Sequence, residues 1–218
     1  MTIHLRAVPI AVFPLLGLFG LVPVHARADD RADAFRALQA GLAGDSRAAA
    51  VAHALYRDLS EAAPADPALL AYAGAAETIV GRDAPSPTDA LKVTLAGLAR
   101  VDRAVAQLGR AHDAPGPNGM PARLETYLVA ATTYLGVPED VFHRRADAKP
   151  LLAKALAHPA LARMPPSVRA MFAQLEAQVA RVEERPADEL AALKRVVALD
   201  PTGPDAADAQ ARIDLLSR

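Results

Sequence analysis

The chain has 218 residues, of which 52% are apolar and only 4% aromatic, and its formal net charge is −1. This near-neutral balance argues against nucleic acid or an anionic membrane surface as the main partner, because both attract a concentrated positive field. The chain contains no cysteine, which excludes a disulfide framework. An apolar core must therefore hold the fold, and a chain of this length can bury one.

The first 28 residues have the order of features typical of a secretory signal peptide. Arg6 gives a positive start, residues 7–24 carry no charge, and Ala26 and Ala28 place small residues before a predicted cleavage site after Ala28. Removal of this segment would leave 22 basic and 25 acidic side chains in residues 29–218, a net charge of −3. We therefore expect a periplasmic or secreted protein, which touches the membrane only if the segment is retained.

Helical patterns begin directly after the predicted signal segment. Residues 30–42 have apolar side chains at helical spacing, and a second pattern starts at Asp45. Asp66-Pro67 predicts the start of a third helix, because Asp accepts from free amides and Pro fits the first turn. Thr88-Asp89 predicts the cap of a fourth. The apolar faces of the first and fourth helices contain Phe35, Leu38, Leu42, Leu91, Leu95, Leu98, Val101 and Val105.

The second half begins after the Pro- and Gly-rich loop 109–121. A helix is predicted from Pro121 to Leu135, and then a short helical turn, a kink and a helix over residues 149–157. The spacing over residues 165–182 predicts the most amphipathic helix, and Pro186 and Pro204 start the last two. No segment alternates apolar and polar residues as a strand would. The sequence therefore predicts an all-α protein of eight or nine antiparallel helices.

Three segments resemble the tetratricopeptide-repeat family, which stacks helix pairs of about 34 residues. They are Leu70-x-x-Ala73-Gly74-x-x-Glu77, Gly97-x-x-x-Val101-x-x-Ala104 and Ala198-Leu199-Asp200-Pro201. The chain departs from the pattern in its long loops and at Glu189, where a small residue is expected. It is also similar to the tetratricopeptide-like accessory component of periplasmic-binding (TRAP-type) transporters. The resemblance implies that residues 29–218 form one short α-solenoid of stacked helix hairpins.

The resemblance also implies a binding surface on the concave face formed by the first helix of each repeat. The positions transferred in this way are Glu125, Val129, Thr132, Arg169, Ala173 and Glu176. Mixed charge and a small aliphatic residue fit a peptide or protein segment better than a hydrophobic metabolite. We therefore expect an adaptor that binds an unidentified envelope protein without catalysis.

Two other functions remain open. The first is a small-molecule carrier that serves a transporter and buries its ligand between hairpins. The second is an enzyme whose site is dispersed over several helices. A pocket with convergent polar groups would favour the carrier, whereas an open groove of mixed charge would favour the adaptor. Paired carboxylates in a cleft would favour the enzyme.

The sequence contains none of the local motifs that catalysis or cofactor binding commonly uses. G-x-S-x-G, H-E-x-x-H, G-x-G-x-x-G and a phosphate loop ending in GK[ST] are all absent. Six scattered histidines without cysteine do not predict a zinc site. We therefore expect no metal, no cofactor and no enzymatic activity.

Four further features allow both a functional and a plain structural interpretation. Residues 143–145, His-Arg-Arg, could hold an anion, but a solvated linker is favoured. His53 lies in a helix and is interpreted as a partly buried structural histidine. Tyr127 and Tyr134 share one helical face, which favours core packing over an aromatic binding groove. The loop 115–119 could be a recognition loop, although a plain insertion is favoured.

Overall fold

The computed structural model describes residues 24–116 and 119–218, with side chains from residue 29 onward. These residues form ten α-helices and two 3₁₀-helices, and the one bridge between extended residues among them joins Pro115 to Pro121. The all-α prediction is confirmed. Most of the predicted signal segment lies outside the described residues. Within the described part, no helix combines the length and apolar character needed to cross a membrane.

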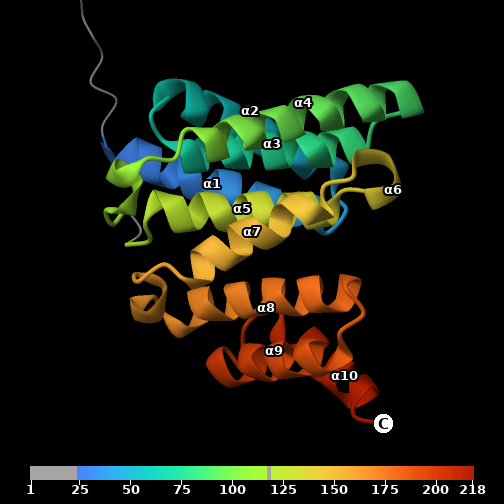
Figure 1. Ribbon diagram of the computed structural model, residues 1–218. Coiled ribbons are helices and arrows are strands. Elements are labelled where there is room, and N and C mark those ends of the chain that lie inside the picture. Colours follow the sequence, from blue (N-terminus) through green and yellow to red (C-terminus); the bar gives the residue numbers. More distant parts are fainter. Residues whose placement is uncertain (1–23, 117–118) are drawn as a thin grey trace, which may run out of the picture.

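The helices follow one another through short connections. They are α1 (Val24–Leu42), α2 (Ser46–Ala62), α3 (Pro67–Arg82), α4 (Pro87–Ala106), α5 (Ala122–Gly136), α6 (Glu139–Phe142), α7 (Arg145–Leu156), α8 (Pro166–Val182), α9 (Pro186–Leu199) and α10 (Ala206–Leu216), with 3₁₀-helices at Arg110–Asp113 and Leu161–Arg163. In Figure 1, α1 to α4 form the upper part of the molecule, α5 and α7 the middle, and α8 to α10 the lower part.

Side-chain caps set several of the helix starts. Asp45 Oδ1 accepts hydrogen bonds from two backbone amides of α2 at 3.0 Å, and Asp66 Oδ1 accepts one from Ala68 N at 3.0 Å. The predicted cap of α4 at Thr88-Asp89 is wrong. Ser86 is the cap, because its hydroxyl accepts from Asp89 N at 3.1 Å and donates to the Asp89 carboxylate.

Three other predicted boundaries also differ. Helix α1 begins at Val24, before the predicted cleavage site, rather than at Asp30. Helix α7 begins at Arg145 rather than at residue 149, so Pro150 lies inside it. A proline is tolerated there because the carbonyl that it leaves without a partner belongs to the first turn. Helix α10 begins at Ala206, two residues after Pro204.

Helix α3 is the most deeply buried helix and lies between α2, α4 and α5. It approaches α4 closely at two glycines: a Cβ on Gly74 would lie 2.6 Å from the Gly97 carbonyl oxygen, and the reverse distance is also 2.6 Å. The salt bridge from Arg100 Nε to Glu77 Oε2, 2.7 Å long, joins the same two helices. Small residues at the contact let the two backbones touch, which fixes the position of α4 over α3.

Helix α8 packs against two separate clusters of the core. Its Phe172, Leu175 and Val179 pack into the cluster built by α4, α5 and α7, whereas its Ala173 and Ala177 pack against α9 and α10. The amphipathic stripe predicted for residues 165–182 therefore faces a core, as expected. Glu189 stands where the tetratricopeptide-repeat pattern has a small residue, and the structure gives a reason. Its buried carboxylate pairs with Arg212 of α10 at 2.7 Å. Whether the hairpins form a tetratricopeptide-like solenoid stays a prediction.

Candidate functional site

The described residues form a cleft of about 680 Å³. We call it the apolar cleft. Its walls come from α1, α3, α4, α5 and α6, and α8 adds one methionine. The lining residues are Phe35, Leu38, Gln39, Leu42, Tyr72, Ala75, Thr78, Ile79, Gly81, Arg82, Pro87, Ala90, Leu91, Thr94, Leu128, Val129, Thr132, Thr133, Gly136, Val137, Pro138, Val141, Phe142 and Met171. In Figure 1, α6 lies at the right, below the first turns of α4.

The apolar cleft gathers apolar side chains that helices normally bury. Ten large hydrophobic residues are exposed in the described part of the chain, and half of them line this cleft. These five are Phe35, Leu42, Leu91, Val141 and Met171, with 38–53% of their surface exposed. Scattered exposed hydrophobic residues are common, but a contiguous group marks a binding surface. The cleft is therefore the best candidate for a functional site.

Aromatic rings form one wall of the cleft. The rings of Tyr72 and Tyr56 stack with centroids 4.7 Å apart, and the Phe35 ring meets Tyr72 edge-on at 6.5 Å. The Tyr72 hydroxyl hydrogen-bonds to Glu125. Burial, and then the charge of Glu125, hold the pKa of Tyr72 well above its usual value. Tyr72 therefore presents a neutral, already bonded phenol to the cleft.

Most polar groups of the lining are already hydrogen-bonded within the protein. Thr78 Oγ1 donates to the Ala75 carbonyl at 2.7 Å, and Thr133 Oγ1 donates to the Val129 carbonyl at 2.8 Å. Among the described residues of the lining, Arg82 carries the one formal charge, and its guanidinium donates to the neighbouring carboxylate of Asp83. The cleft thus combines an apolar surface with few polar groups, which is the usual composition of a small-molecule site.

The predicted site residues on α5 lie at this cleft. Val129 and Thr132 line it. Glu125, one turn earlier, is buried and does not line the cleft, but it is hydrogen-bonded to Tyr72, which does. The structure therefore places Val129 and Thr132 at a cavity and makes Glu125 a support for one of its walls.

The predicted site residues on α8 lie elsewhere. Ala173 is buried in the core shared with α9 and α10. Glu176 forms a 3.0 Å salt bridge with Arg195 of α9. Arg169 is half-buried, and its Nε has no hydrogen-bond partner in the described part of the chain. The one residue that α8 adds to the apolar cleft is Met171. The structure thus does not bring the two predicted groups into one site.

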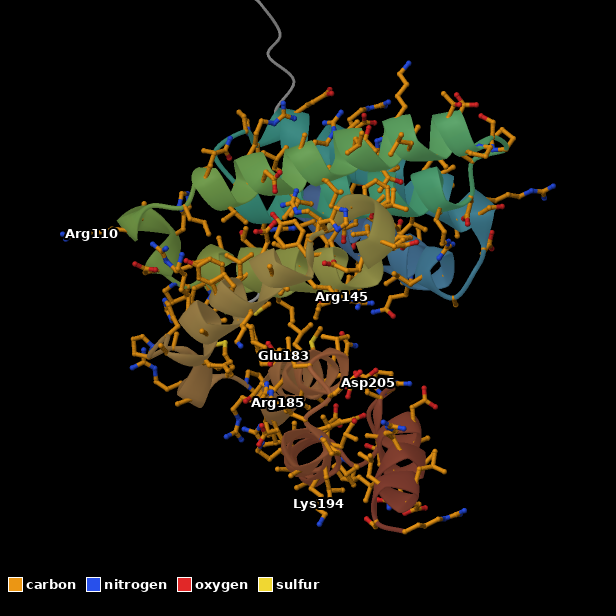
Figure 2. All side chains as sticks on the ribbon, turned by 45° about the vertical axis from the view of Figure 1, so that its right-hand side comes forward. Arg110, Arg145, Glu183, Arg185, Lys194 and Asp205 are labelled. Carbon is orange, nitrogen blue, oxygen red and sulfur yellow. The ribbon has the colours of Figure 1, made fainter. Side chains whose placement is uncertain are left out.

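Glu176 lines a second, smaller groove of about 370 Å³, which we call the charged groove. It lies between α7, α8 and α9 and is lined by Lys149, Leu152, Ala153, Leu156, Glu176, Val179, Ala180, Arg185, Asp188, Ala191, Ala192 and Arg195. At its edge, Glu183 pairs with Lys149 at 2.8 Å and with Arg185 at 2.7 Å. Figure 2 labels Glu183 and Arg185, which lie close together at the turn between α8 and α9. Hydrogen bonds from Lys149 and Arg185 lower the pKa of Glu183.

Arg144 binds within the protein rather than to solvent or to an anion. Its Nη1 donates to Asp102 Oδ2 at 3.1 Å, and its guanidinium lies 4.2 Å from the centroid of the Tyr134 ring. The Tyr134 hydroxyl donates to the same carboxylate at 2.6 Å. Burial alone would raise the pKa of Asp102, but the hydrogen bonds from Arg144 and Tyr134 outweigh it, so the pKa is lowered. The solvated-linker interpretation is therefore wrong for Arg144, which ties the end of α6 to α4 and α5.

The structure agrees with two of the plain structural interpretations. Tyr127 and Tyr134 are buried in the core, as core packing requires. His53 is partly buried, and burial lowers its pKa. The loop 109–121 contains residues outside the described part, but Arg123 of α5 holds its described part by donating to Asp113 and to the Gly109 carbonyl.

No group of three or more His, Asp or Glu side chains in the described part of the chain could hold a metal ion. Helical periodicity does not predict the cleft, because it assigns Phe35, Leu42 and Leu91 to buried helix faces. One signal pointed to it, since α4 carries more apolar positions than its contacts with α3 and α5 can cover.

Comparisons with models of known protein families, with curated proteins and with solved structures gave no significant match.

Proposed function

We propose that the protein is a non-catalytic binding protein of the cell envelope that holds an apolar ligand in the apolar cleft. One observation carries this proposal: half of the exposed large hydrophobic residues in the described part of the chain line one cavity. Leaving them in water costs free energy that a ligand would recover by covering them.

The size and shape of the cavity favour a small molecule over a long protein segment. Its volume of about 680 Å³ lies within the range of roughly 300–1,000 Å³ that is usual for small-molecule sites. Its lining comes from six helices that converge on one space, whereas a docked helix needs a straight channel. This is the carrier function that the sequence left open, in which the ligand lies between helix hairpins.

Two further observations fit a carrier without catalysis. Arg82 is the one charged residue on the lining, and no acidic residue among the described ones lines the cleft. General acid–base chemistry would require titratable groups that converge on a substrate. The signal-like segment at residues 1–28 supports a place in the periplasm or outside the cell, where a carrier could serve a transporter.

Extraction of the purified protein with organic solvent tests this function. The protein should be expressed in its native host and purified without detergent. Mass spectrometry should find one class of apolar compound in near-stoichiometric amount, and the stripped protein should bind the fluorescent apolar probe N-phenyl-1-naphthylamine at one site. A protein that yields no such compound and does not bind the probe would contradict the proposal.

A second candidate is the adaptor, and the charged groove favours it. The groove combines an apolar floor of Leu152 and Val179 with charged residues at its edges, among them Glu176 and Arg195. A partner segment with apolar and charged side chains would fit such a surface. Affinity purification of the tagged protein at moderate salt tests it, and recovery of one stoichiometric envelope protein is the expected result.

A further inference from the structure

We infer that the ligand of the apolar cleft is an uncharged molecule, with an aliphatic or ring body and a neutral polar group such as a hydroxyl, ester or amide. This inference rests on the proposed function and names the chemical class of its ligand. It follows from how the polar groups of the cleft are already used.

An anionic ligand would find no unpaired positive charge among the described residues of the lining. Arg82 Nε and Nη2 donate to the two carboxylate oxygens of Asp83 at 2.7 and 2.9 Å, and Nη2 also donates to the Gly41 carbonyl at 2.9 Å. The pair carries no net charge, and the two side chains stay close because the residues are neighbours in the chain. A ligand carboxylate would therefore lose its hydration without gaining an ion pair.

A cationic ligand would find no counter-ion among the described residues of the lining. None of these residues is acidic, and the buried carboxylate of Glu125 is hydrogen-bonded to Tyr72. A cation could also bind to an aromatic face. However, Tyr56 covers one face of Tyr72 by stacking, and Phe35 packs against the same ring in a T-shaped arrangement.

Three neutral polar side chains remain for a ligand. Gln39 of α1, Thr94 of α4 and Thr132 of α5 line the cleft, and none of them forms a side-chain hydrogen bond within the described part of the chain. An amide and a hydroxyl can each donate and accept. They suit a hydroxyl, ester or amide group of the ligand, which costs far less to transfer from water than a charge.

A matched series of twelve-carbon compounds tests the inference. The stripped protein would be titrated with N-phenyl-1-naphthylamine in competition with dodecan-1-ol, dodecanoate or dodecylamine. The pH would be about 8, where the acid and the amine are charged. The alcohol should displace the probe with an affinity at least about 10-fold higher than that of either charged compound. The double variant Arg82→Gln/Asp83→Asn should keep this order, because it removes both charges of a neutral pair.

The possible outcomes separate this inference from the proposed function. Tighter binding of dodecanoate, lost in the double variant, would overturn the inference and show that Arg82 recognises an anion. Tighter binding of dodecylamine, or equal binding of all three compounds, would also overturn it, and the carrier function would stand. Failure of the probe itself to bind would instead overturn the proposed function.

Discussion

Gly74 of α3 and Gly97 of α4 face each other so closely that a Cβ on either residue would lie 2.6 Å from the carbonyl oxygen of the other. This contact fixes α4 on α3, and the first turns of α4 provide one wall of the apolar cleft. The cavity therefore depends on a backbone contact at some distance from its lining.

Replacing Gly74 by alanine should destabilise the protein by about 1–3 kcal/mol, because one helix must move away from the other. Chemical denaturation would measure the change. Gly136→Ala is the matched control, since a Cβ at Gly136 meets no atom within 4 Å. That variant should be as stable as the parent or slightly more so, because alanine favours the helix. A Gly74→Ala protein of unchanged stability would contradict the packing described for α3 and α4.

Stability at acid pH should depend on Asp102. Its pKa is lowered in the folded state by the hydrogen bonds from Arg144 and Tyr134, which outweigh burial. A carboxylate with a lowered folded pKa stabilises the protein above its unfolded value of about 4, and this contribution disappears as the pH falls through the folded value. Thermal unfolding between about pH 3 and pH 7 should show the parent more stable than Asp102→Asn near neutral pH, with the difference shrinking below about pH 4. A difference that does not change with pH would contradict the assigned contacts.

Filling the cleft should abolish binding without unfolding the protein. Thr132 is exposed on the cleft wall, so Thr132→Trp places a large ring in the cavity with little disturbance of the core. The affinity for N-phenyl-1-naphthylamine should fall at least about 10-fold, since the added ring occupies the space of the ligand. Thr88→Trp is the control, because Thr88 is exposed on α4 but does not line the cleft. Equal losses of affinity in both variants would place the probe elsewhere.

The adaptor function makes a separate prediction. If a partner binds at the charged groove, Glu176→Ala and Arg195→Ala should reduce its recovery in affinity purification, and higher salt should weaken the complex further. Leu91→Gln, which alters the apolar cleft, should leave recovery unchanged. Recovery that is insensitive to Glu176 and Arg195 would exclude the groove as the docking surface.

Local chemistry allowed much of the fold to be predicted. Asp66-Pro67 and Pro166 start helices where capping and the fixed φ of proline favour them. The spacing of Phe172, Leu175 and Val179 correctly indicated a helix with one buried face. These signals lie within one or two turns of a single helix, so they do not depend on how the helices pack.

The site could be predicted only in part, because it depends on contacts between distant segments. Leu91 and Leu98 lie on the same face of α4, yet Leu98 is buried against α5 while Leu91 is 44% exposed where the two helices separate. Periodicity identifies such a face but cannot tell where a neighbouring helix ends. In the same way, the spacing predicted that Val129 and Thr132 share one face of α5, and both line the cleft, whereas the aromatic wall formed by Phe35 and Tyr72 comes from helices far apart in the sequence.

The most direct test compares Leu91→Gln with Leu95→Gln. Both leucines lie on α4, one turn apart, and are 44% and 50% exposed, but only Leu91 lines the apolar cleft. Titration with N-phenyl-1-naphthylamine should show binding weakened by about 5- to 30-fold in Leu91→Gln, which corresponds to about 1–2 kcal/mol of lost apolar contact, and no change in Leu95→Gln. Equal affinities in the two variants would contradict the proposal that the apolar cleft is the ligand site.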